Sequence, residues 1–149
     1  MSESKPVKKA PAKKPVAKPS KFKAPVTAPV TCEFGKKGAL WSAGWHTGID
    51  YGAKRGTPVH AVADGIIIAA AWGQAYGKHI VIQHGAYRYL YAHLESKENL
   101  PAGTHVKQGQ VIGLSGDTGN VTAPHLHLEA RKHPYRYAID AVNPKEALQ

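Results

Sequence analysis

The clearest alternation of apolar and polar positions lies at residues 125–131. If this stretch is a β-strand, successive side chains point to opposite faces. The apolar face holds Leu126, Leu128 and Ala130, and the polar face holds His125, His127 and Glu129. The apolar face can enter a core, while the two imidazoles lie about 6–7 Å apart along the strand. They are either surface histidines on a half-exposed strand or part of a metal or catalytic site.

Six further stretches have the character of short strands, and glycine-rich turns separate them. They are residues 58–62, 66–71, 79–83, 87–93, 105–106 and 111–114. Short strands at this spacing are typical of an antiparallel all-β core. We therefore predict an all-β fold, mainly an antiparallel sheet, in which only residues 95–100 and a turn after Pro144 favour helix.

Residues 87–93 show a second regular alternation. One predicted face carries aromatic side chains and ends in a histidine: Tyr87, Tyr89, Tyr91 and His93. The other predicted face carries Arg88, Leu90 and Ala92. His93 is therefore expected at the end of an aromatic strand face.

Most of the positive charge lies in the first 30 residues. The 149-residue chain has a formal net charge of +10, and residues 1–30 hold eight lysines against one glutamate. With six prolines and a single aromatic residue, Phe22, this segment cannot bury enough apolar surface to fold. We therefore expect a disordered Lys/Ala/Pro-rich tail at 1–30 and one domain at 31–149. The tail is either a solubilising linker or an attachment to a polyanion, such as an anionic wall polymer, nucleic acid or a membrane surface.

Cys32 is the one cysteine of the chain, so it cannot form an intramolecular disulfide. An ordinary free thiol is favoured over a metal ligand or a reactive residue. No apolar run approaches the roughly 20 residues needed to span a bilayer, so no membrane insertion is expected. The first residues lack the hydrophobic region of a secretory signal, which predicts another route for a protein that acts outside the cytoplasm.

A second polar cluster occurs in the stretch His46-Thr-Gly-Ile-Asp50. Glycines 48 and 52 disfavour a helix here and favour a loop running into a strand. Such a loop can bring an imidazole and a carboxylate onto one cation, a ligand set suited to Zn²⁺. With one histidine of the pair at 125 and 127, the site has three protein ligands and an open position, as catalytic zinc sites do. The residues alone leave open which of His125 and His127 binds.

Several motifs in order make the chain resemble the lysostaphin-like zinc endopeptidases, which cut peptidoglycan peptides. The resemblance covers about residues 41–145. The motifs are His46-Thr-Gly-Ile-Asp50, Gly56-Thr-Pro-Val59, Ala63-Asp-Gly65, Tyr91-Ala-His-Leu94, Gly109-Gln-Val-Ile-Gly113 and Ala123-Pro-His-Leu-His-Leu-Glu129. Two positions depart from the usual family pattern, since Ala123 replaces Gly and Leu128 replaces Phe.

The resemblance implies one zinc ion in an open groove of the sheet, bound by His46, Asp50 and His127. It implies His93 and His125 as a catalytic pair that handles protons and the oxyanion. The implied activity is hydrolysis of an amide bond in peptidoglycan stem peptides or cross-bridges, and we expect the protein to be a monomer. Together with the missing signal, this predicts a phage lysin or virion-associated wall hydrolase that acts at the bacterial cell wall and lies in the host cytoplasm before release.

Two other readings of the chain stay open. A non-catalytic member of the family could bind the wall or activate another hydrolase, although such members generally lack ligands that this chain has. A nucleic-acid-associated protein is disfavoured, because the domain shows no basic stripe interleaved with aromatic residues, and no specific nucleic acid is expected as a partner.

The remaining polar residues receive structural interpretations. Glu129 either orients a metal ligand or forms a strand-end salt bridge, and we favour the salt bridge. Five histidines match no functional position and are expected at the surface or in strands: His60, His79, His84, His105 and His133.

Overall fold

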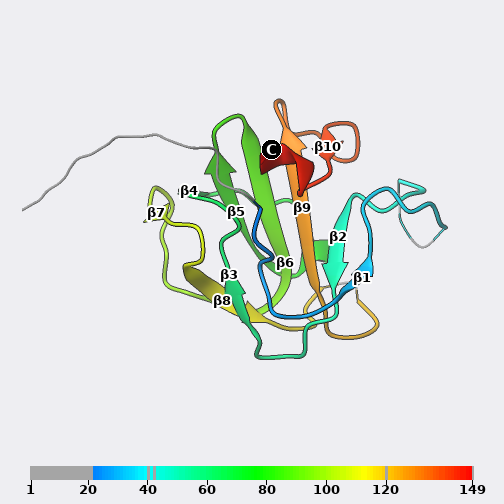
Figure 1. Cartoon of the computed structure of the whole chain (residues 1–149), viewed down its shortest axis with the longest axis horizontal. Helices are drawn as coiled ribbons and strands as arrows, with labels where there is room; N and C mark the ends of the chain where they lie inside the picture. The colour runs from blue at the N-terminus through cyan, green and yellow to red at the C-terminus, as the bar shows by residue number, and fades with distance from the viewer. Residues whose placement is uncertain (1–21, 40, 42, 120, 149) are drawn as a thin grey trace, which may run out of the picture.

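A computed structural model describes residues 22–39, 41, 43–119 and 121–148, which form an antiparallel sheet with almost no helix (Figure 1). The strands are β1 Val30–Cys32, β2 Gly48–Tyr51, β3 Pro58–His60, β4 Gly65–Ile68, β5 Lys78–His84, β6 Tyr87–Lys97, β7 His105–Val106, β8 Val111–Ser115, β9 Leu126–Lys132 and β10 Ala141–Val142. The only helical segments among the described residues are the 3₁₀ turns Gln74–Tyr76 and Glu146–Leu148. The predicted all-β antiparallel fold is confirmed. Neither turn is long or apolar enough to cross a membrane.

The longest strand, β6, pairs with three other strands, β5, β8 and β9. The strand order is β1-β2-β9-β6-β5-β4-β7, with β10 against β9 and β8 against both β3 and β6. In Figure 1, β6 and β9 run side by side through the middle of the molecule. The helix expected at 95–100 is wrong, because β6 continues to Lys97 and places Ser96 and Lys97 opposite β8. The ladder satisfies backbone groups that a helix would otherwise pair internally.

The alternation predicted for residues 125–131 is confirmed on its apolar face. Leu126, Leu128 and Ala130 are fully buried in the main core. The polar face is buried as well, since His127 is 6% exposed and Glu129 is completely enclosed. The strand is therefore covered on both faces, and its polar side chains need partners within the protein.

The segment before β1 packs against the domain. Val26 is 4% exposed in the main core, and Phe22 lies against that core. The backbone of this segment is tied down too, because the Pro25 and Pro29 carbonyls accept hydrogen bonds from the N–H groups of His60 and Gly52. Residues 22–30 thus differ from the disorder expected for 1–30, since a few apolar side chains pack in or against the core of the domain. Residues 1–21 of the expected tail lie outside the described residues.

Two core tyrosines on β6 offer a matched test of buried hydrogen bonding. Tyr89 and Tyr91 are both fully buried. The Tyr91 hydroxyl accepts a hydrogen bond from the Val62 N–H at 2.9 Å, whereas the Tyr89 hydroxyl has no partner among the described residues. We expect Tyr91→Phe to lower the free energy of unfolding by about 1–3 kcal/mol, because it leaves a buried donor unpaired.

Tyr89→Phe is the control for this prediction. It removes a hydroxyl that is buried without a partner, so we expect its free energy of unfolding to stay equal to that of the wild type or to rise. Urea denaturation of the three proteins measures both effects. Equal losses in the two variants would contradict the assigned hydrogen bond.

Candidate active site

A row of polar side chains crosses neighbouring strands on one face of the sheet. Asp50 in β2 lies opposite His127 in β9, and His127 lies opposite Ala92 in β6. On the other side of β2, Asp50 lies opposite Cys32 in β1. Directly opposed residues of an antiparallel pair share a face with their Cβ atoms about 4.5–5.5 Å apart. The flanking residues of β2, Ile49 and Tyr51, point into the core, so Asp50 points away from it.

His46 approaches this row from the loop before β2. Its ring is 1% exposed, and its Nδ1 lies 3.0 Å from the Glu33 carbonyl oxygen, to which it donates a hydrogen bond. In the neutral ring, Nε2 then carries a lone pair. This lone pair faces Oδ1 of Asp50 at 3.1 Å and has no hydrogen-bond partner. A ring nitrogen and a carboxylate oxygen that face one another at this distance can share a proton, or bind a cation in its place.

A proton on His127 offsets the negative charge of the neighbouring carboxylates. Its Nδ1 lies 2.9 Å from Oδ1 of Asp50, and its Nε2 lies 2.9 Å from Oε1 of Glu129. Burial favours the neutral ring, but the hydrogen bonds to Asp50 and Glu129 outweigh it and raise the pKa of His127 to about 9. Burial also opposes the charge on Asp50, yet His127 and His46 hold the pKa of Asp50 well below its usual range.

The same Asp50 oxygen therefore lies between two imidazole nitrogens. A divalent cation in place of the His127 proton would receive the lone pairs of His46 and His127 together with the Asp50 carboxylate. Two imidazoles and one carboxylate with a further open position form a recognised catalytic zinc set. The residues present thus fit a zinc ion.

A bulge in β6 brings His93 to this site. Ile80 lies opposite Tyr91, but Lys78 lies opposite Leu94, so β6 contains one extra residue there. His93 has a φ of 62°, and Leu94 packs in the same core as Tyr91. The bulge interrupts the alternation and turns the His93 ring toward the site. The prediction that His93 shares the tyrosine face is therefore wrong.

His93 and His125 lie together beside the proposed ligands. Their ring centroids are 4.8 Å apart, and the His93 ring is 6.1 Å from that of His127. In both rings Nδ1 donates to a backbone carbonyl, that of Thr118 for His93 and that of Ala123 for His125. Burial and the neighbouring imidazoles lower the pKa of His93 to about 4, against the hydrogen bond to Thr118. His93 is consequently neutral near pH 7, with a free lone pair on Nε2.

Glu129 orients His127 through a hydrogen bond from Nε2 of the imidazole. Its Oε1 accepts hydrogen bonds from Thr47, Tyr76 and His127, and its Oε2 accepts one from Arg131 at 2.7 Å. Burial opposes the charge, but His127 and Arg131 lower the pKa of Glu129 to about 2. The salt bridge favoured from the sequence is present, and it belongs to a buried network that also orients His127.

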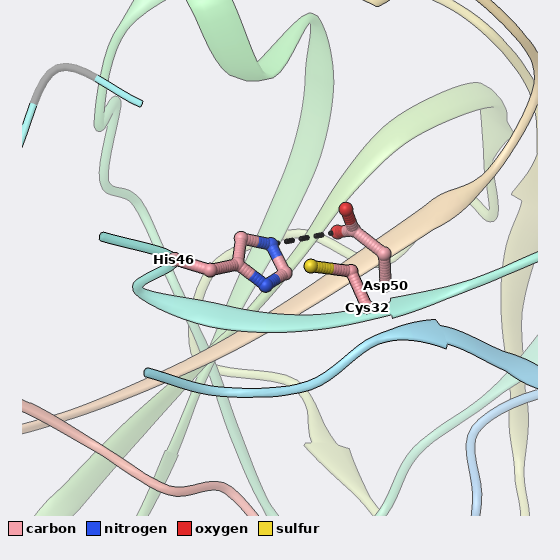
Figure 2. A group of neighbouring side chains, drawn as sticks. All are labelled: Cys32, His46 and Asp50. Atoms are coloured by element: carbon pink, nitrogen blue, oxygen red, sulfur yellow. Dashed lines mark ion pairs between the residues drawn. The ribbon is translucent and has the colours of Figure 1, made fainter. Parts of the chain in front are cut away.

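The structure brings together all five site residues expected from the sequence and adds Cys32. The ligand atoms of Cys32, His46 and Asp50 lie within 4.8 Å of one another, as Figure 2 shows. Burial and the nearby Asp50 raise the pKa of the Cys32 thiol. The sequence signal was hidden, because it depends on the pairing of residues 30–32 with β2.

The histidines set aside in the sequence make local contacts instead. His60, His79 and His84 hydrogen-bond the backbone carbonyls of Gly109, Gly77 and Asp64. His133 lies against the ring of Tyr135, and His105 is an exposed residue of β7.

Comparisons with known proteins identify the family of the chain. The model of peptidase family M23 matches residues 44–144, so the chain belongs to this family. It is 48% identical over 87 residues to the DD-carboxypeptidase/endopeptidase Mpg of Neisseria meningitidis, covering 58% of this chain and 20% of Mpg. It is 45% identical over 91 residues to the glycyl-glycine endopeptidase ALE-1 of Staphylococcus capitis, covering 59% of this chain and 25% of ALE-1. The chain therefore spans a quarter or less of the length of these relatives.

Solved structures of the family share the fold. The catalytic domain of lysostaphin from Staphylococcus simulans superposes with a TM-score of 0.71 at 35% identity, covering 81% of this chain and 92% of that domain. The catalytic domain of the prophage-encoded M23 protein EnpA from Enterococcus faecalis gives a TM-score of 0.68 at 32% identity, covering 79% and 89%. The predicted resemblance to the lysostaphin-like enzymes is confirmed.

A substitution at Gly48 in β2 tests whether the metal site needs the close approach of β2 to β9. A Cβ at this position would lie against the Leu128 carbonyl oxygen and 2.7 Å from Cε1 of His127. We expect Gly48→Ala to displace the His127 ring and weaken zinc binding by about 10–100-fold, the range seen when ligand support is lost. Competition titration with a chromogenic chelator measures the affinity.

Gly65→Ala is a matched control. A Cβ there would lie against the Gln83 carbonyl oxygen and 2.5 Å from Cγ2 of Ile82, between β4 and β5. This variant should lose stability while it keeps the wild-type zinc affinity. Equal zinc affinities in both variants would show that the approach at Gly48 does not set the metal site.

Proposed function

We propose that this chain is a zinc-dependent endopeptidase that hydrolyses an amide bond in peptidoglycan stem peptides or cross-bridges. The convergence of His46 Nε2 and His127 Nδ1 on Oδ1 of Asp50, at 3.1 and 2.9 Å, carries the proposal. Membership of the M23 family and similarity to a glycyl-glycine endopeptidase and a DD-carboxypeptidase/endopeptidase support the substrate class.

Three residues would hold the metal: His46, Asp50 and His127. When bound, zinc supplies Lewis-acid chemistry, which activates water near neutral pH and polarises the carbonyl of the scissile amide. Glu33 and Glu129 fix which nitrogen of each imidazole faces the site, because the Glu33 carbonyl accepts from Nδ1 of His46 and the Glu129 carboxylate accepts from Nε2 of His127.

His93 and His125 would move the protons. The neutral His93 ring presents an unprotonated Nε2 and can accept the proton of the attacking water. His125 lies nearer solvent, and its Nε2 is 3.8 Å from Oδ1 of Asp50. A protonated His125 can stabilise the developing oxyanion or donate a proton to the leaving amine. The Nδ1 hydrogen bonds to backbone carbonyls hold both rings in position.

The proposal includes a biological setting, the degradation of a bacterial wall during phage infection. A phage lysin or a virion-associated wall hydrolase fits this activity, and the similarity to a prophage-encoded M23 protein supports it. The lysines of the first residues would add attraction to anionic wall polymers, which is independent of the catalytic site.

Substitutions can separate metal binding from proton transfer. His127→Ala should lose both zinc and hydrolysis of purified peptidoglycan, because it removes a ligand. His93→Ala should retain stoichiometric zinc and hydrolyse about 10²–10⁴-fold more slowly, because it removes only proton transfer. Metal analysis and release of peptide fragments followed by mass spectrometry measure the two properties.

His60→Ala serves as the control, because its ring bonds the Gly109 carbonyl away from the site. It should keep both zinc and activity, and chelation should abolish hydrolysis by every active form. Full activity of folded His127→Ala protein would refute the ligand assignment.

Deletion of residues 1–21 tests the role of the basic segment. The deletion removes seven lysines and one glutamate but spares the packed segment that begins at Phe22. We expect weaker binding to anionic cell walls and a shallower dependence of binding on salt, since fewer cationic contacts remain. Wall pull-down across a salt series measures this, with hydrolysis of a soluble peptide as the control. Unchanged binding would reject the attachment role.

A further inference from the structure

The row of side chains at the site continues one strand beyond the expected zinc ligands. Cys32 lies opposite Asp50 in the β1–β2 pair, just as His127 lies opposite Asp50 in the β2–β9 pair. The thiol therefore shares the face that carries the ligands. Figure 2 shows Sγ of Cys32 beside the His46 ring and the Asp50 carboxylate, and the three ligand atoms lie within 4.8 Å of one another.

A second observation makes this cluster more than a neighbouring thiol. The His46 ring is 1% exposed, and its Nε2 has no hydrogen-bond partner although it points into the cluster. In a tetrahedral zinc site, sulfur and nitrogen ligands lie about 3.5 Å apart, given bond lengths near 2.3 and 2.0 Å. Small side-chain rotations would therefore bring Sγ and Nε2 to ligand separation without a change in strand pairing.

We propose that Cys32 binds the zinc as a thiolate, as a fourth protein ligand beside His46, Asp50 and His127. This proposal rests on the proposed function, because it assumes zinc at these residues. On binding, the thiol releases its proton to solvent. Four protein ligands leave no open position for water, and closed sites of this kind are structural rather than catalytic. Thiolate binding would thus hold the enzyme in a latent form.

The strand that carries the thiol is suited to a reversible contact. β1 has three residues, stands at the edge of the sheet and pairs with β2 through an irregular register. Movement of this short strand would withdraw the thiolate, which regains a proton from solvent. Asp50 on β2 and His127 on β9 would stay in place. His46 is held through Nδ1 by the carbonyl of Glu33, next to Cys32, so the movement that opens the site has to be confined to residues 30–32.

Cobalt substitution tests the proposal directly. The full-length protein loaded with one equivalent of Co²⁺ should show a near-ultraviolet thiolate-to-cobalt charge-transfer band. Cys32→Ser should bind Co²⁺ without this band, and its zinc affinity should fall by about tenfold or more. In the wild type, zinc should slow alkylation of the thiol by iodoacetamide, whereas the chelated protein should react freely. Cys32→Ser should also hydrolyse peptidoglycan several-fold faster than the wild type.

A relocated thiol provides the matched control. Thr31→Cys combined with Cys32→Ser keeps one thiol on β1 but moves it to an exposed position, whose native hydroxyl hydrogen-bonds the Asp50 backbone carbonyl rather than the ligand atoms. It should bind Co²⁺ without the charge-transfer band, and zinc should not protect it from alkylation.

The possible outcomes separate this proposal from the proposed function. If the wild type binds stoichiometric Co²⁺ without the band, or zinc leaves alkylation unchanged, ligation by Cys32 is overturned while the zinc site stands. If a band is present but Cys32→Ser is no faster, latency is overturned. If neither protein binds metal, the proposed function itself fails.

Discussion

The site depends above all on the register between β2 and β9. Ile49 and Tyr51 on one strand and Leu128 on the other are buried in the main core, so their burial fixes which residues face each other. A slip of one residue would send these side chains to the wrong face and turn Asp50 toward the core. The hydrophobic packing that stabilises the sheet therefore also sets the separation of Asp50 and His127.

The bulge at His93 determines on which face of β6 this imidazole lies. In a regular strand, the residue after Ala92 would point into the core with Tyr91, where an imidazole would need a buried partner. The extra residue places His93 on the site side and returns Leu94 to the core. The backbone cost of a positive φ at a non-glycine residue is about 1–3 kcal/mol, and the Nδ1 hydrogen bond to Thr118 helps to offset it.

The parts of the structure that the sequence predicted were those governed by local alternation. The buried face of β9 follows from its leucines, and most strands from β3 to β9 fall near their expected ranges. Alternation could not reveal the bulge, because in a regular strand Leu94 fits the face of Leu90 and Ala92 equally well. It also could not reveal that residues 22–30 join the domain, since their few apolar side chains are stabilised only by the core that the rest of the fold provides. The position of Cys32 beside Asp50 was hidden for the same reason.

Charge balance links the buried network to the proposed thiolate. Without metal, the carboxylates of Asp50 and Glu129 are balanced by Arg131 and by the proton on His127. A zinc ion with a neutral His127 adds one net positive charge to this partly buried cluster, which attracts an electron-rich substrate oxygen but is costly when nothing occupies the open position. A Cys32 thiolate would restore the balance of the metal-free state. The same electrostatics that prepare the site for substrate therefore favour its closure by the only thiol of the chain.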